Sequence, residues 1–167
     1  MDSGKKTINH VEIEIRKILP VQDGYRMPGE YEPHRGCILI WPERPGSWRH
    51  GAREAKKAFA DVIRAIAKSE EVYLAASGKT FSEAEKLAQR LQTDEALYPI
   101  RVFEAETDDA WARDVGPTFV TDGQEVRGIN WEFNAWGGTE DGLYASWEKD
   151  NRFAPFFCEK EGYTWYD

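Results

Sequence analysis

Cysteine is scarce in this sequence of 167 residues, and its scarcity excludes a disulfide framework. The two cysteines are Cys37 and Cys158, and no cysteine or histidine spacing is typical of a zinc site. We therefore predict that the protein binds neither a metal nor a cofactor. We also predict a reducing, cytoplasmic location. Cys37 lies in an apolar run at residues 36–40 and is expected to be a buried core thiol. Cys158 is expected in a helix near the end of the sequence.

Long hydrophobic runs and an excess of positive charge are also missing. The wholly apolar runs are far too short to cross a bilayer, and residues 1–24 contain no apolar core of signal-peptide length. No membrane partner is expected. With 22 Lys and Arg against 30 Asp and Glu, the net charge is −8, which argues against nucleic acid as a partner because phosphate binding needs a basic face. A negative field is compatible with a cationic small-molecule substrate.

Apolar runs and helical patterns alternate over the middle of the sequence. This alternation of apolar runs with segments of helical periodicity predicts an α/β fold whose early strands are parallel. The strands are expected at residues 37–41, 72–76 and 98–103, and the helices at about 53–68 and from Thr80, where Thr80 and Glu83 form a capping box. The apolar stripe of the first helix comprises Ala55, Ala58, Phe59, Val62, Ile63 and Ile66. One core between sheet and helix is expected to contain Trp41, Phe59, Ile63, Leu74 and Val102.

The remaining segments are less regular. Asp122-Gly123 is a hairpin signal between expected strands at residues 118–121 and 125–133. A last helix is expected at residues 151–160. Residues 1–26 are mixed in pattern, with a short alternating stretch, and we interpret them as an N-terminal arm laid over a domain at 27–167.

The densest polar cluster beside apolar strands is residues 108–117, which contain Asp108, Asp109, Trp111, Arg113 and Asp114. Carboxylates bind a guanidinium through paired, charge-assisted hydrogen bonds, and an indole face attracts a cation. The cluster therefore suits an arginine-like cation. An alternative is an ion-paired loop in which Arg113 neutralises Asp109 or Asp114.

Four blocks together carry a resemblance to the agmatine deiminase family, in its order and approximate spacing. They are Met-Pro-Gly-Glu-Tyr-Glu-Pro-His at 27–34, Ile-Trp-Pro-Glu-Arg-Pro at 40–45, Asp-Ala-Trp-Ala-Arg-Asp at 109–114 and Asn-Ala-Trp-Gly-Gly at 134–138. The resemblance covers roughly residues 24–167. It implies a pentein fold, in which αβ units surround a pseudo-fivefold axis, and about two of the five units lie in this sequence.

The resemblance also implies an activity, the hydrolysis of agmatine to N-carbamoylputrescine and ammonia in putrescine biosynthesis. By position, Asp114 resembles the family's guanidinium-binding aspartate and Trp111 its substrate-contacting tryptophan. The family's nucleophilic cysteine and catalytic histidine are expected beyond Asp167, so no catalytic residue is expected within these residues. Cys37 and Cys158 match neither the position nor the context of that nucleophile.

Two other functions stay open. One is a peptidyl-arginine deiminase-type enzyme, and the other is a non-catalytic module that kept a cation-binding site. The blocks at 40–45 and 134–138 favour agmatine. A homo-oligomer is possible, because a pentein cut after two units leaves strand edges and apolar faces uncovered.

Overall fold

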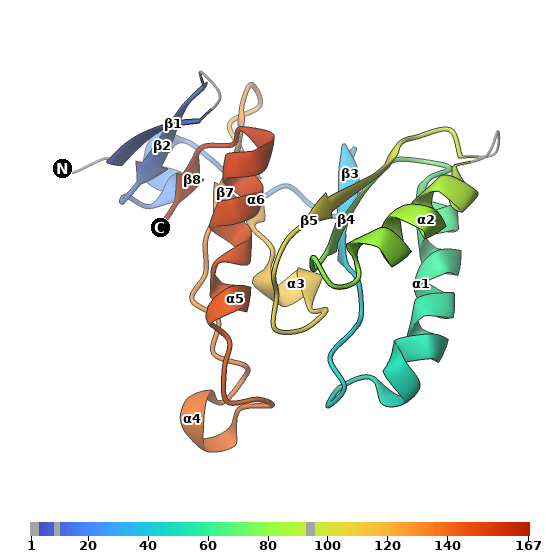
Figure 1. The fold of residues 1–167 in the computed structure, drawn as a ribbon. Helices are drawn as coiled ribbons and strands as arrows, with labels where there is room; N and C mark the ends of the chain where they lie inside the picture. Colours follow the sequence, from blue (N-terminus) through green and yellow to red (C-terminus); the bar gives the residue numbers. More distant parts are fainter. Residues whose placement is uncertain (1–3, 9–10, 93–95) are drawn as a thin grey trace. The chain divides into compact units, whose positions relative to one another are not determined.

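Two β-sheets organise residues 4–8, 11–92 and 96–167, the residues that the computed structural model describes (Figure 1). The chain divides into two compact units. One unit is Pro33–Ala112, with a three-stranded sheet. The other joins Met1–Glu32 to Arg113–Asp167, with a five-stranded sheet.

The three-stranded sheet is parallel throughout, as the alternating pattern predicts. Its order is β3 (Gly36–Ile40), β4 (Glu71–Ala76) and β5 (Ile100–Glu104). Parallel neighbours need a crossover connection. Helices α1 (Arg53–Ile66) and α2 (Phe81–Leu91) supply the two crossovers, and a 3-10 turn, η2 (Arg49–Ala52), leads into α1. Figure 1 shows both helices on the same face of this sheet.

The predicted core forms between this sheet and its two helices. The five residues predicted to share this core pack in one cluster, which confirms the prediction. They are Trp41, Phe59, Ile63, Leu74 and Val102, and Ile63 and Leu74 are 0% exposed. Burying a side chain such as Ile63 contributes about 1.5–3 kcal/mol. The expected apolar stripe of α1 was too wide, because Ala58 and Val62 are exposed. Ala58 lies about 100° around the helix from half-buried Phe59, and Val62 lies equally far from buried Ile63, so both face solvent.

The predicted capping box at the start of α2 is wrong in its hydrogen bonds. Thr80 is the N-cap residue, but its side chain makes no capping hydrogen bond. Glu83 instead accepts a hydrogen bond from Lys56 Nζ at 2.6 Å. The carboxylate therefore connects α2 to α1 and leaves its own helix end uncapped.

The five-stranded sheet mixes two antiparallel hairpins with parallel pairs. Its order is β1 (Gly4–Ile8), β2 (Val11–Arg16), β8 (Trp165–Tyr166), β7 (Val126–Ile129) and β6 (Thr118–Thr121). The β6–β7 hairpin confirms the turn predicted at Asp122-Gly123. Strand β7 ends at Ile129, four residues before the predicted end, because Ile129 pairs with the first residue of β6 and with the last residue of β8. Beyond it, neither neighbouring strand continues.

Short helices complete the fold, and one of them, α3, spans the boundary between the two units. They are η1 (Pro20–Asp23), α3 (Ala112–Val115), α4 (Gly138–Asp141), α5 (Glu148–Asn151) and α6 (Phe153–Glu161). Helix α6 confirms the predicted last helix. It buries Phe153, Ala154, Phe157 and Cys158.

An ionic network joins the N-terminal residues to the rest of their unit. Asp23 accepts hydrogen bonds from Arg16, from Arg127 Nη1 at 3.0 Å and from Tyr166 Oη at 3.0 Å. Burial opposes ionisation, but the hydrogen bonds from Arg16 and Tyr166 and the charge of Arg127 hold the pKa of Asp23 below its ordinary value. The strand β2 also pairs with β8. The division into an arm at 1–26 and a domain at 27–167 stays a prediction.

Helix α6 approaches the backbone of β7 closely at Gly128. A Cβ added to Gly128 would lie 2.5 Å from Cys158 Sγ and 3.3 Å from Cβ of Pro117. Such a distance is far below van der Waals contact, so only glycine fits between this strand and helix without a shift.

We predict that Gly128→Ala lowers the free energy of unfolding by about 1–3 kcal/mol, because overpacking forces neighbouring atoms apart. Urea unfolding of the protein measures the loss. Adding Cys158→Ala removes the Sγ atom and should restore part of the stability of the Gly128→Ala protein. Gly46→Ala is the control, since its Cβ would meet nothing closer than Arg44 Nε at 4.0 Å. Equal losses for the two glycine variants would contradict this account.

Candidate functional site

The polar cluster at 108–117 lies in the loop after β5 and in the single helical turn of α3. The boundary between the two compact units falls inside α3, between Ala112 and Arg113. Trp111 therefore belongs to the unit Pro33–Ala112, and Asp114 to the other unit. Gly116 and Pro117, which follow α3, are buried.

Asp109 is a buried carboxylate, with 4% of its surface exposed. Its Oδ1 accepts hydrogen bonds from Trp48 Nε1 and from the backbone N–H of Ala110, each at 2.8 Å. Its Oδ2 accepts a hydrogen bond from Ser47 Oγ. Burying a carboxylate is costly unless hydrogen bonds replace its hydration, and these three donors do so.

Trp111 continues a chain of aromatic rings that begins in the core. Its ring centroid lies 6.0 Å from that of Trp48, with 32° between the planes. Trp48 meets Phe59 edge-on at 6.4 Å, and Phe59 meets Trp41 edge-on at 6.2 Å. Edge-to-face and offset contacts at these distances are the favourable geometries for aromatic pairs. Trp111 is half-buried, so part of its ring remains accessible.

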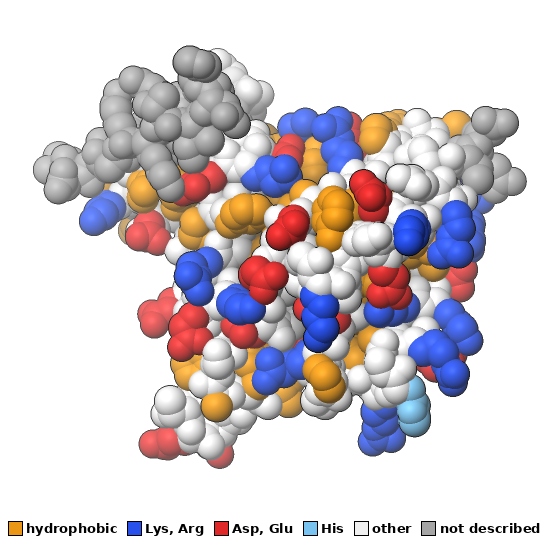
Figure 2. Space-filling model, in the orientation of Figure 1, with side chains coloured by type: hydrophobic (Ala, Val, Ile, Leu, Met, Phe, Trp, Pro, Cys, Tyr) orange, Lys and Arg blue, Asp and Glu red, His pale blue; other side chains and the backbone are white. Residues whose placement is uncertain are grey.

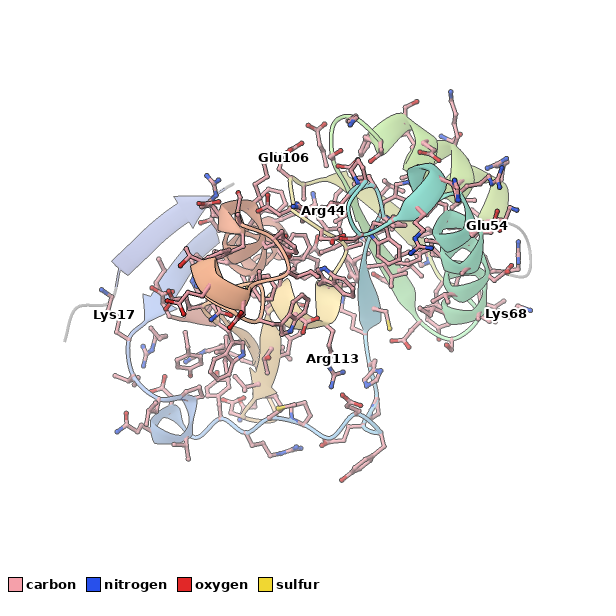
Figure 3. The ribbon with its side chains drawn as sticks, turned by 90° about the horizontal axis from the view of Figure 1, so that it is seen from below. Lys17, Arg44, Glu54, Lys68, Glu106 and Arg113 are labelled. Carbon is pink, nitrogen blue, oxygen red and sulfur yellow. The ribbon has the colours of Figure 1, made fainter. Side chains whose placement is uncertain are left out.

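Asp114 is exposed, in contrast to Asp109. Among the described residues it has no hydrogen bond or ion pair, so its carboxylate is available to a ligand. The ion-paired-loop interpretation is wrong, because Arg113 contacts neither Asp109 nor Asp114. Its Nη2 lies 2.5 Å from Glu30 Oε1, and the Arg113 side chain is 82% exposed. Figure 3 shows Arg113 pointing away from α3.

The block at 40–45 continues into a loop that supports the cluster. We name residues 42–48 the support loop. The Ser77 hydroxyl, at the end of β4, donates to Glu43 Oε2 at 2.9 Å. Arg44 Nη1 donates to the carbonyl oxygen of Asp108 at 3.1 Å, and Figure 3 places Arg44 in the loop that leaves β3. A turn in which the N–H of Trp48 donates to the Arg44 carbonyl at 2.9 Å completes the loop.

Ser47 and Trp48 are the site residues that sequence reasoning missed. The Trp-Pro-Glu-Arg-Pro block directly precedes them, which is a signal that this loop matters. Nothing in the local pattern, however, names Asp109 as their partner, since it lies 62 and 61 residues away.

The block at 134–138 forms a tight turn in the five-stranded unit. Ala135 and Trp136 have φ angles of 53° and 63°, in the left-handed region that non-glycine residues rarely adopt. A Cβ on Gly137 would lie 2.4 Å from the carbonyl carbon of Asp141, so the backbone approaches itself closely at this turn. The turn leaves Trp136 52% exposed, with its ring 5.1 Å from that of Phe133 and nearly perpendicular to it.

Neither cysteine has the environment of an activated nucleophile. Burial, followed by the charge of Glu159, raises the pKa of Cys158 to about 12. Cys37 is only half-buried, so the prediction that it is a buried core thiol is wrong. Its strand β3 is the edge of a three-stranded sheet and is covered less than β4. Burial and then the nearby Glu70 carboxylate raise the pKa of Cys37 as well.

Of the described histidines, neither His34 nor His50 hydrogen-bonds to a cysteine or to the polar cluster. His34 is 46% exposed and lies 3.6 Å from Glu70 Oε2, and His50 is exposed. His10 lies outside the described residues. Over the described ranges, no group of three or more His, Cys, Asp or Glu side chains is arranged to hold a metal ion. Within those same ranges no helix has the length and apolar character needed to cross a membrane.

We predict that Cys158 resists thiol reagents in the folded protein. With a pKa of about 12, its thiolate fraction at pH 8 is on the order of 10³-fold below that of an ordinary cysteine. Kinetics with Ellman's reagent on Cys37→Ser should show no fast phase until denaturant is added. Cys158→Ser is the matched control and should retain the slow reaction of half-buried Cys37. Fast labelling of Cys158 in the native Cys37→Ser protein would contradict the prediction.

The parallel βαβαβ unit, the polar cluster that follows its strands and the unit with the mixed sheet are parts of a pentein fold, with about two of its five αβ units. Residues 26–167 match the model of the Porphyromonas-type peptidyl-arginine deiminase family. The chain belongs to that family.

Named relatives refine the comparison. "Putative agmatine deiminase 1" of Listeria monocytogenes (serotype 4b, strain F2365) is 51% identical over 141 residues, which are 84% of this chain and 36% of the relative. Agmatine deiminase of Pseudomonas aeruginosa (strain LESB58) is 48% identical over 143 residues, 85% of this chain and 37% of the relative. The solved agmatine deiminase of Enterococcus faecalis is 41% identical, with a TM-score of 0.79 over 90% of this chain and 40% of that one. The chain thus spans well under half the length of these relatives.

Proposed function

We propose that the protein containing this sequence is an agmatine deiminase, which converts agmatine and water into N-carbamoylputrescine and ammonia. The similarity to proteins named agmatine deiminase, at 41% to 51% identity over 84% to 90% of this chain, carries the proposal. The exposed carboxylate of Asp114 and the accessible ring of Trp111 support it, because they offer the charge and the π face that a guanidinium needs.

In this proposal the residues described here bind and orient the substrate. Asp114 pairs with the guanidinium, and Trp111 lies against its plane. A thiolate adds to the guanidinium carbon, ammonia leaves, and water then displaces the thiolate to give the carbamoyl product. Holding the cation on a carboxylate favours the attack, since the electrophile is fixed in place before the thiolate reaches it. Neither Cys37 nor Cys158 supplies this thiolate, because the raised pKa of each disfavours it.

The family name makes a peptidyl-arginine deiminase the second candidate. Agmatine is favoured because the Pseudomonas relative at 48% identity and the Enterococcus enzyme at 41% are both named agmatine deiminase. A non-catalytic module with a cation site is the third candidate. The proposal includes a cytoplasmic enzyme without nucleic-acid or membrane partners, and a homo-oligomer is possible.

Asp114→Asn tests the binding role in the longest open reading frame that contains this sequence. The amide keeps the shape but removes the charge, so the bound guanidinium loses its counter-ion. Losing one member of a buried charge pair costs about 2–5 kcal/mol, or roughly a 30-fold to several-thousand-fold loss in kcat/KM for ammonia release. Trp111→Ala should cost about 1–3 kcal/mol through lost packing and cation–π contact.

Asp141→Asn is the matched control, because it removes an exposed carboxylate from α4. It should leave kcat/KM and the melting temperature almost unchanged. The Asp114→Asn protein should melt near the wild-type temperature, since that carboxylate forms no ion pair with any residue that the structure describes. A clearly lower melting temperature with normal kcat/KM would remove Asp114 from the proposed substrate site.

We also expect the 167 residues alone to release no ammonia from agmatine. Neither cysteine has the depressed pKa of an active nucleophile, and losing a nucleophile removes most of the rate. Turnover by the purified chain that disappears in Cys37→Ser or Cys158→Ser would overturn this expectation.

A further inference from the structure

We propose that Asp109 is a positioning residue that sets the ring of Trp111 by way of Trp48, an inference that rests on the proposed function. Asp109 and Asp114 come from the same block, yet the structure separates their roles. Asp109 is 4% exposed and hydrogen-bonded within its unit, whereas Asp114 is exposed. The buried acid serves the scaffold, and the exposed acid serves the ligand.

Both oxygens of Asp109 are already used by the protein. Oδ1 accepts from Trp48 Nε1 and Ala110 N, each at 2.8 Å, and Oδ2 accepts from Ser47 Oγ. An ionised carboxylate has about four acceptor positions. A side chain with at least three of them occupied and almost no exposed surface is poorly suited to receive a substrate cation.

These hydrogen bonds hold Trp111 from two directions. The bond to Ala110 N holds the Asp109–Ala110 peptide, which is one peptide unit before Trp111. The bond to Trp48 Nε1 fixes one edge of the Trp48 ring, while Phe59 meets that ring edge-on at 6.4 Å and 82°. Trp111 then lies against Trp48 at 6.0 Å. One buried carboxylate therefore bonds both to the backbone just before Trp111 and to the ring that Trp111 contacts.

The support loop holds this arrangement at the carboxyl ends of the parallel strands. Arg44 Nη1 donates to the Asp108 carbonyl at 3.1 Å, and the Ser77 hydroxyl donates to Glu43 Oε2 at 2.9 Å. In open α/β sheets, ligands bind outside these strand ends. A side chain displaced by about 1 Å there costs substantial rate, so supporting residues of this kind affect catalysis without touching the substrate.

The test compares Asp109→Asn with Asp109→Ala in the longest open reading frame that contains this sequence. An asparagine keeps an oxygen for Trp48 and Ala110, and its NH₂ group can donate to the Ser47 hydroxyl. The positioning role predicts kcat/KM for agmatine within about threefold of wild type for Asp109→Asn and a loss of about 30-fold or more for Asp109→Ala. A charge-binding role predicts that Asp109→Asn loses as much as Asp114→Asn, and this result would overturn the proposal.

A second measurement does not depend on activity. In the same protein, tryptophan is replaced with 5-fluorotryptophan, which includes the seven tryptophans of this sequence. The ¹⁹F resonances of Trp48 and Trp111 are assigned from Trp→Phe variants. Asp109→Ala should shift or broaden the Trp48 and Trp111 resonances and leave that of Trp165 unchanged. An unchanged Trp111 resonance in a folded Asp109→Ala protein would overturn the proposal.

Trp48→Phe is the variant that remains informative if Asp109→Ala does not fold. It keeps an aromatic ring and removes the N–H donor, so the Trp111 resonance should move, and kcat/KM should fall about tenfold or more. No change in either quantity would overturn the proposal. If the wild-type protein releases no ammonia from agmatine, the proposed function fails, and the ¹⁹F resonances alone still decide whether Asp109 positions Trp111.

Discussion

A buried carboxylate, that of Asp109, joins the loops that end the three-stranded sheet. A carboxylate with 4% exposure is stable in that place only when donors replace the water it has lost. Those donors come from Ser47 and Trp48, which lie 62 and 61 residues away in the sequence. The conformation of residues 108–111 therefore depends on contact between the loop after β3 and the loop after β5.

The parallel sheet is what makes this meeting possible. Because β3, β4 and β5 are parallel, their carboxyl ends lie at one edge. The support loop, Ser77 and the loop that contains Asp109 all start from that edge. The core of Trp41, Ile63 and Leu74 holds the strands against α1 and α2, so the polar arrangement rests on apolar packing.

The tryptophans differ widely in exposure, and the number of tryptophans in the sequence does not show which of them are buried. Trp41 and Trp165 are buried, whereas Trp131 and Trp136 are more than half exposed. Trp111 lies between these extremes, with one ring contact inside its unit and an accessible remainder. That intermediate position is what a ligand-binding aromatic needs, because the protein holds it and it still presents a face. On the surface seen in Figure 2, positive and negative side chains are interspersed among the apolar ones.

The sequence by itself determined the main helices and strands and the family. Apolar periodicity located both crossover helices and the parallel strands, and the Asp122-Gly123 turn signal located the hairpin, since these depend on neighbours a few residues apart. The sequence also identified the block that contains Trp111 and Asp114. Only the tertiary structure decided which acid is buried, that Arg113 pairs with Glu30 and that Cys37 is half-exposed. The physical reason is distance along the chain: the partners of Asp109 are far away in sequence, and sheet pairing and packing bring them together.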